Sequence, residues 1–425
     1  MTDSPQPDEP DEGESGRGGA TGPGAGLPGL PFGPGAAASF DLGQLMRMLQ
    51  SEGPVNWEVA RQVAAWVALE GAGEQPVDAA DREQFDELAR AAQTHVVAET
   101  GLTATFRAPL RAVGPKEWSD LHLDALRPVL EALAANLGEV MRSAGPTEIE
   151  GEPGPGGAAA AGPFGADPFG GLLGMLAPLL LGLQAGSMIG YLAQHALGRY
   201  DLPLPTSDEP SLCFVVPNVV AFEEAWSLPR ADLRFYLALH EVVHAAERSV
   251  PWVRERLVRL TTEYVSAYEL DTAAFESKFG DIDPSDPTSL GGIAEDPEAL
   301  LGAMRSPRQG EMLAQLQSLT SVLEGYADSV LERIGARLIP SFAQIHEAMK
   351  RHRLERGEAE RFVQRLLGLA LEREHYERGE AFCAGVVERA GVDGLNRLWE
   401  QERMLPTSAE VEAPGLWLAR IELPD

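Results

Sequence analysis

The sequence predicts a mainly α-helical protein with a small β component, on three observations. Most of the chain beyond residue 36 repeats apolar side chains at the three- and four-residue spacing of amphipathic helices. Residues 212–216, Leu-Cys-Phe-Val-Val, are a short β-branched and aromatic run that ends at Pro-Asn and predicts a strand. Residues 240–244 read His-Glu-Val-Val-His inside a helical pattern, so one helix is expected to carry a metal site.

Composition narrows the class of protein. The chain has 425 residues, 44% of them hydrophobic, enough for one large domain or two smaller ones. Its formal net charge of −31 argues against nucleic acid as a partner, because phosphate binding needs clustered Lys and Arg. The start of the chain lacks the basic and apolar regions of a signal peptide. We therefore expect a cytoplasmic protein in which Cys213 and Cys383 are free thiols, with one disulfide as the alternative.

The N-terminal part divides into a tail and a helical region. Residues 1–36 are acidic and rich in Gly and Pro, so they bury too little apolar surface to fold, and we expect a disordered tail. Residues 37–143 are a predicted helical region. Its helices are expected at 56–70, at 79–99 after Asp78 or Asp81, and at 118–137, where Pro128 kinks or ends the first part.

A linker precedes the predicted catalytic domain, residues 172–425. Residues 144–171 are rich in Gly, Pro and Ala and predict a flexible linker or loop. The uncharged segment 168–194 is long enough to span a bilayer, but it contains Pro178, several glycines and polar side chains. It also lacks flanking clusters of Lys or Arg. A buried core helix packed against the predicted metal-binding helices is the favoured interpretation, and membrane contact through this segment is the alternative.

The metal site is predicted from the spacing of His240 and His244. Residues four apart lie on one helical face, one turn apart, so both imidazoles can reach a single ion. Glu241 is rotated by about 100° from His240 around the helix axis. It can therefore reach a water on the ion more easily than the ion itself, and we expect it to be the catalytic acid/base.

A catalytic metal needs a third protein ligand and an open position. The metzincin arrangement is excluded, because its ligand position is occupied by Val250. Glu324, on a largely apolar helix predicted at 308–339, is the favoured ligand, since a buried carboxylate needs a partner. Asp328 is expected to accept the free N–H of a ligating histidine and fix its tautomer. Glu247 is the alternative third ligand, although a ligand from the same helix closes a tetrahedron less easily.

The C-terminal part predicts further helices and one more candidate residue. A helix is expected from Pro251 to about Phe275, followed by a loop at 279–298. Tyr376 is the candidate donor to the oxyanion of a tetrahedral intermediate, with a packing tyrosine as the alternative. The remaining helices are expected at 341–352, 357–372, 374–390 and 394–402.

Several motifs carry a resemblance to a known family. They are 190–194, 200–205, 216–218, 239–244, 323–328, 376–379 with Phe382, 405–407 and 414–417. The chain resembles the zincin-like metallopeptidases of actinobacteria and chloroflexi, which are regarded as hydrolases and in some members associated with deazaflavin coenzyme biosynthesis. The similarity covers residues 37–425. It implies a mostly helical zincin-like metallopeptidase fold with one zinc ion per chain, bound in a gluzincin-like way by His240, His244 and Glu324, with Glu241 as acid/base.

The resemblance also sets two further expectations. In zincins a strand near the metal-binding helix lines the cleft and pairs with an extended substrate, which here would be strand 212–216. The family pattern has a histidine where this chain has Tyr326, so the surroundings of the ligands differ at that point.

Together, motif and resemblance predict a zinc-dependent hydrolase, a metallopeptidase that acts on a peptide or protein substrate. The alternative is a non-catalytic metal-binding scaffold or regulatory protein with a zincin fold. Neither the physiological substrate nor the oligomeric state follows from the sequence.

Overall fold

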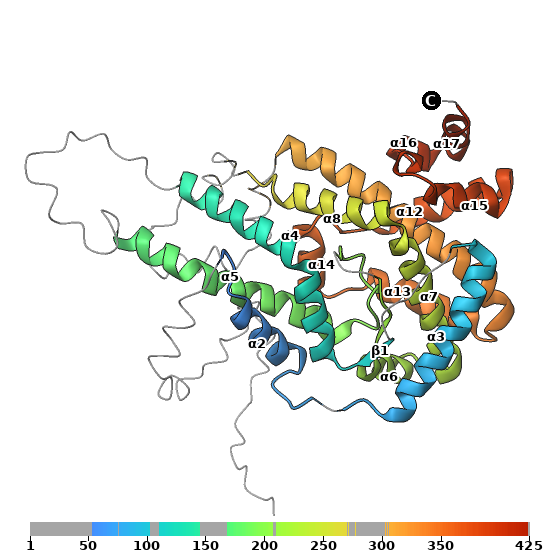
Figure 1. Cartoon of the computed structure of the whole chain (residues 1–425), viewed down its shortest axis with the longest axis horizontal. Coiled ribbons are helices and arrows are strands. Elements are labelled where there is room, and N and C mark those ends of the chain that lie inside the picture. The colour runs from blue at the N-terminus through green and yellow to red at the C-terminus, as the bar shows by residue number, and fades with distance from the viewer. Residues whose placement is uncertain are drawn as a thin grey trace, which may run out of the picture.

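The computed structural model is mostly helical, with one two-stranded sheet among the residues that it describes, which confirms the predicted fold class (Figure 1). The predicted tail 1–36 and nearly all of the predicted linker 144–171 lie outside the described residues. The structure describes residues 53–74, 76–102, 110–144, 168–206, 210–269 and 306–423, with a few single positions between 271 and 304.

The elements follow one another along the chain as short and long helices around a small sheet. The strands are β1 (Arg111–Val113) and β2 (Cys213–Val215). The helices are α2 (Trp57–Ala68), α3 (Ala79–Thr100), α4 (Pro115–Ala144), α5 (Pro168–His195), α6 (Val216–Ala225), α7 (Arg230–Ser249), α8 (Pro251–Val265), α12 (Pro307–Leu338), α13 (Phe342–Leu354), α14 (Glu358–Leu366), α15 (Arg373–Asn396), α16 (Ser408–Glu412) and α17 (Pro414–Ile421).

Helix starts follow local capping chemistry. Asn56 and Asp78 are the N-caps of α2 and α3, and each side chain accepts a hydrogen bond from a backbone N–H of the first turn. Ser306 and Gln309 form a capping box at the start of α12. The long helix α4 continues through Pro128, so of the two predictions for this position, a kink or an end, the end is wrong.

Strand β2 lies between two neighbours rather than at an edge. It pairs in parallel with β1 on one side. On the other side Gly198 forms an antiparallel bridge with Phe214, and the N–H of Val215 donates to the carbonyl of Leu197 at 3.0 Å. The expectation that this strand pairs with an extended substrate is therefore wrong for this arrangement, because the chain's own segment 197–199 occupies the available edge.

Helix α5 packs against α2 through a stripe of glycines. A Cβ at any of three glycines of α5 would collide with a backbone carbonyl of α2 or its N-cap, so only glycine permits this close approach. The glycines and the carbonyls that they face are Gly182 and Asn56, Gly186 and Ala60, and Gly190 and Ala64. The main partners of α5 are α2 and α4, and Leu180 on α5 is exposed, so the prediction of a buried core helix against the metal-binding helices is wrong about its partners. In the described part of the chain, no helix is both long and apolar enough to cross a membrane.

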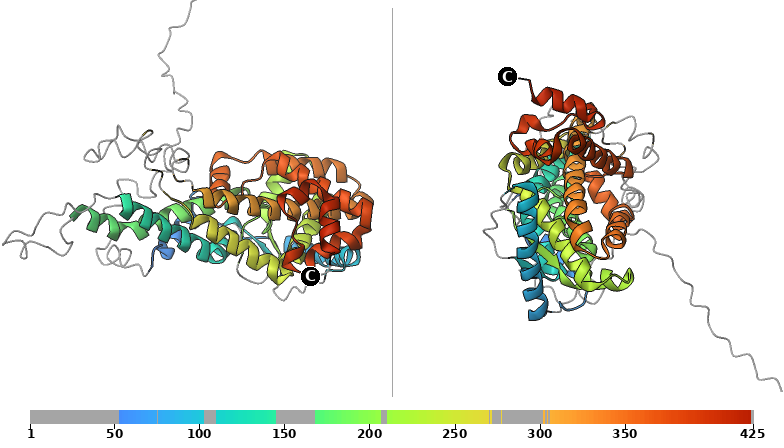
Figure 2. Two further views of the ribbon diagram at one scale, coloured as in Figure 1. Left: turned by 90° about the horizontal axis from the view of Figure 1, so that it is seen from above. Right: turned by 90° about the vertical axis from the view of Figure 1, so that its right-hand side faces the viewer.

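Helix α12, drawn in orange, contacts α7, α8 and α15 (Figures 1 and 2). Gly325 of α12 lies against the backbone of Gly379 of α15, and a Cβ at Gly325 would collide with it. Helices of the predicted N-terminal region and of the predicted catalytic domain contribute to one buried apolar cluster. Both cysteines are free and buried, and burial raises the pKa of each thiol.

Candidate metal and catalytic site

Helix α7 carries the two histidines into the interior. Every residue from Tyr236 to Arg248 is buried, which places the whole motif away from bulk water. The ring centroids of His240 and His244 lie 4.6 Å apart, edge to face. Both imidazoles therefore occupy one face of α7, as the spacing predicts.

His244 is held by a carboxylate on its own helix. Its Nδ1 lies 2.7 Å from Oε2 of Glu247, and both side chains are fully buried. Its Nε2 is buried without a hydrogen-bond partner. Burial, reinforced by the charges of His240, Arg248 and Arg353, holds the pKa of His244 well below its usual value. The imidazole is therefore neutral, the form that binds metals.

The Glu247 carboxyl is equally deep. Burial raises the pKa of Glu247 well above its usual value, and the charges of Glu324 and Asp328 act in the same direction. The charge of Arg248 acts in the opposite direction but does not cancel these effects. A metal at Nε2 of His244 needs the ring proton on Nδ1, where an ionised Glu247 accepts it. Loading a metal therefore favours the ionised form of Glu247.

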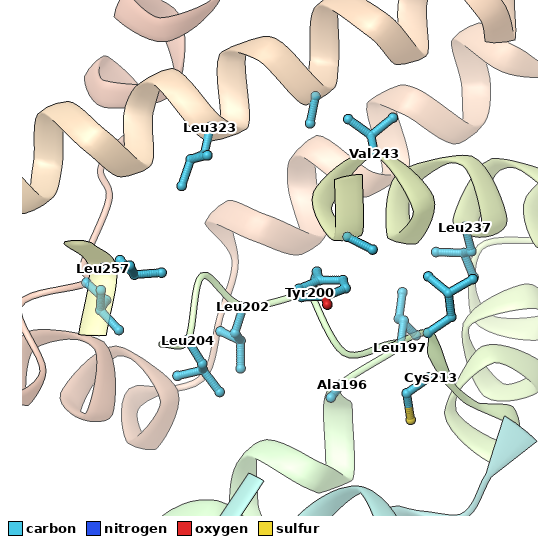
Figure 3. Close-up of a cluster of buried hydrophobic side chains, with 14 of the residues drawn as sticks. Ala196, Leu197, Tyr200, Leu202, Leu204, Cys213, Leu237, Val243, Leu257 and Leu323 are labelled. Carbon is cyan, nitrogen blue, oxygen red and sulfur yellow. The ribbon is translucent and has the colours of Figure 1, made fainter. Parts of the chain in front are cut away.

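The Glu241 carboxylate accepts hydrogen bonds from the backbone of the segment that follows α5. Its Oε2 accepts from the N–H of Arg199 and its Oε1 from the N–H of Tyr200, both at 2.9 Å. A Cβ at Gly198 would collide with this carboxylate, so the close approach requires glycine. Figure 3 shows Tyr200 and Leu202 of this segment in the same buried cluster as side chains of α7 and α12.

Glu324 and Asp328 face a third helix, α13. Arg353 donates from Nη1 to Oε2 of Glu324 at 3.0 Å, and from Nη2 to both oxygens of Asp328 at 3.0 and 2.9 Å. All three side chains are nearly inaccessible to solvent. Burial alone would lower the pKa of Arg353, but the two carboxylates raise it well above its usual value, so the guanidinium stays charged.

The expected contact between Asp328 and a ligating histidine is not seen at His244. Both oxygens of Asp328 are taken by Arg353, and Glu247 contacts Nδ1 of His244. The physical reason is proximity, because Glu247 lies one turn beyond His244 on α7, while Asp328 faces α13.

The two tyrosines of the predicted site lie in different places. The Tyr376 ring lies under the Arg353 guanidinium, 5.1 Å from its centroid, and burial with the Glu324 charge raises the pKa of this phenol. Tyr326 donates to the side chain of Asn396. The Tyr326 hydroxyl is thus hydrogen-bonded to the last residue of α15. The role of Tyr376 as donor to the oxyanion stays a prediction.

A metal ion fits part of this arrangement. The unpartnered, buried Nε2 of His244, with Nδ1 on a carboxylate, is the orientation of a metal ligand, and His240 lies beside it. However, no three His, Cys, Asp or Glu side chains among the described residues lie close enough together to hold an ion. Glu324, the predicted third ligand, is instead paired with Arg353.

Sequence reasoning missed two features of this site. Arg353 gave no signal, because an arginine near the end of an amphipathic helix usually faces solvent. The segment 197–200 had a weak signal in Gly198, the kind of residue that marks a close backbone approach.

The contact between Glu247 and His244 leads to a prediction about metal affinity. Replacing Glu247 with leucine should weaken zinc binding by about 10–100-fold, because His244 loses the acceptor that orients it. Glu247→Gln, which retains an acceptor oxygen, should lie between leucine and wild type. Competition against a chromophoric zinc chelator measures both variants, and equal affinities in all three proteins would contradict the assigned role.

Comparisons with known proteins give a consistent result. A sequence profile described as zincin-like metallopeptidase matches residues 55–418. A crystal structure from Chloroflexus aurantiacus, described as that of a presumed hydrolase with a novel fold, superposes with a TM-score of 0.58 at 28% sequence identity. The similarity covers 87% of this chain and all of the Chloroflexus chain. Among curated proteins no sequence matches.

Proposed function

Because the chain belongs to the zincin-like metallopeptidase family, we propose that it is a zinc-dependent hydrolase that cleaves peptide bonds. His240 and His244 are two of the zinc ligands, Glu324 is the third, and Glu241 is the catalytic acid/base. The expected stoichiometry is one zinc ion per chain, with a peptide or protein as substrate.

One observation carries the proposal. His244 is a buried, neutral imidazole whose Nδ1 is bound by Glu247 and whose Nε2 has no partner. An unpartnered buried nitrogen costs free energy, and a metal ion would remove that cost. The neighbouring ring of His240, 4.6 Å away, supplies a second nitrogen donor of the type that zinc prefers.

The residues of the chain divide the chemistry as follows. Bound zinc would polarise the scissile carbonyl and lower the pKa of the attacking water. Glu241 takes the proton of that water and returns it to the leaving amine. Each carboxylate oxygen of Glu241 accepts one backbone N–H and keeps a further lone pair that can accept from the water. Tyr376 is the proposed donor toward the negative charge that develops on the substrate oxygen.

Elemental mass spectrometry tests the metal, and a peptide-library digest tests the reaction. We expect about one zinc per wild-type chain and strong loss of zinc in His240→Ala and His244→Ala, with folding checked by circular dichroism. We expect chelator-sensitive cleavage by wild type. No metal in wild type after incubation with zinc would overturn the proposal.

A second candidate function is a metal-binding scaffold without turnover. The observation that favours it is the state of Glu241, which is buried with both carboxylate oxygens bound to backbone N–H groups. In that reading Glu241 anchors the segment 197–200. Zinc in wild type, together with no cleavage of any peptide in the library, would favour the scaffold over the hydrolase.

A further inference from the structure

A cluster of buried charges joins α12 to α13. Glu324 and Asp328 are each about 4% exposed and Arg353 about 7%. Buried carboxylates are stable only when they are paired with a cation or with several hydrogen-bond donors. In this arrangement the Arg353 guanidinium is the cation that pairs with both carboxylates.

The guanidinium is bound unequally by its two partners. Both oxygens of Asp328 accept hydrogen bonds from Nη2, whereas only one oxygen of Glu324 accepts a hydrogen bond, from Nη1. The guanidinium carbon also lies over the Tyr376 ring, 5.1 Å from its centroid. If the contact with Glu324 breaks, Arg353 still contacts Asp328 and Tyr376. The buried charge of the guanidinium therefore keeps a carboxylate partner when Glu324 binds elsewhere.

From this geometry we propose that Arg353 is the internal counterion that a metal ion displaces from Glu324, so that the site loads by exchanging one cation for another. The inference rests on the proposed metal site of His240, His244 and Glu324. In this structure Arg353 is hydrogen-bonded to the Glu324 carboxylate. Among the described side chains, no three possible metal ligands lie together. Asp328 retains the guanidinium after the exchange, which makes it a positioning residue.

The exchange predicts opposite effects for two substitutions on one ion pair. Arg353→Met keeps the length and apolar stem of the side chain but removes the competing charge. It should lower the dissociation constant for zinc by about 10–100-fold, the size usual for changes beside metal ligands. Asp328→Asn leaves the guanidinium with Glu324 as its one carboxylate, and should raise the dissociation constant by a similar factor.

The test is a zinc titration of the full chain against a chromophoric chelator, with wild type, Arg353→Met, Arg353→Lys, Asp328→Asn and His240→Ala. Arg353→Lys keeps a cation that can pair with Glu324, so its dissociation constant should lie closer to that of wild type than that of Arg353→Met does. Circular dichroism checks that each variant is folded. An ion pair with only a structural role would lower the thermal stability of the variants without moving zinc affinity in opposite directions.

The outcomes separate this inference from the proposed function. Tighter zinc binding by Arg353→Met and weaker binding by Asp328→Asn support it. Zinc bound by wild type but more weakly by Arg353→Met would overturn the exchange alone, and would mean that Arg353 assists the metal. Zinc bound by neither wild type nor Arg353→Met would overturn the exchange together with the proposed metal site.

Discussion

Replacing Glu241 with glutamine should lower the turnover of peptide substrates by about 10²–10⁴-fold, the range usual for loss of a general base. The glutamine amide cannot take the proton of the attacking water. Zinc should remain bound, because His240, His244 and Glu324 are unchanged. The measurement is kcat on the best peptide from the library digest, with zinc content determined on the same sample.

The structure makes the choice of control important. Glu241 accepts N–H groups from both Arg199 and Tyr200, and glutamine has only one acceptor oxygen. The amide NH₂ would face a backbone N–H, which should cost about 1–3 kcal/mol in unfolding free energy. Turnover must therefore be measured well below the unfolding transition of the variant.

A matched substitution shows whether the loss is specific. Glu255→Gln removes a charge from an exposed position on α8 and should leave kcat and stability nearly unchanged. If Glu241→Gln, folded and zinc-loaded, hydrolyses peptides as fast as wild type, Glu241 is not the base. Its carboxylate would then serve only to anchor the segment 197–200.

Replacing Gly325 with alanine should destabilise the protein by about 3–5 kcal/mol, the upper range for single substitutions. A Cβ at this position would collide with the backbone of Gly379 and Glu380, where α12 and α15 cross. Backbone atoms cannot move aside as a flexible side chain can, so the two helices must separate. Since Gly325 follows Glu324 directly, the shift should also weaken zinc binding.

A control for this prediction lies on the same helix. Gly310 is exposed in the first turns of α12, and a Cβ there meets no atom within 4 Å. Gly310→Ala should be neutral or stabilise by up to about 1 kcal/mol, because alanine has the higher helix propensity. Chemical denaturation of both variants measures the difference. Equal stabilities would show that the crossing of α12 and α15 tolerates a side chain at Gly325.

Local sequence information was sufficient for most of the helices. Asp78 is one of the two residues that the pattern predicts before the helix at 79–99, and α12 begins and ends within a few residues of its expected limits. These features depend on neighbours within one or two turns, which a linear pattern contains. The same reasoning places His240 and His244 on one face of α7, because that relation is internal to a helix.

Contacts between distant segments could not be predicted in this way. Arg353 reaches Glu324 across 29 positions, and the N–H of Arg199 reaches Glu241 across 42. Strand β1 is three residues long and gains its stability from pairing with β2, roughly a hundred residues away. Such short strands have little pattern of their own, and their pairing is decided by the packing of the helices around them.

The same division holds for the candidate site. The spacing of the motif is enough to predict two imidazoles on one buried helix face and an adjacent carboxylate, because helix geometry sets their relative positions. Which carboxylate contacts His244, which cation pairs with Glu324, and which backbone N–H groups bind Glu241 depend on how α7, α12, α13 and the segment 197–200 pack. Buried charges take the nearest partner that the packed chain offers, and only the tertiary structure identifies that partner.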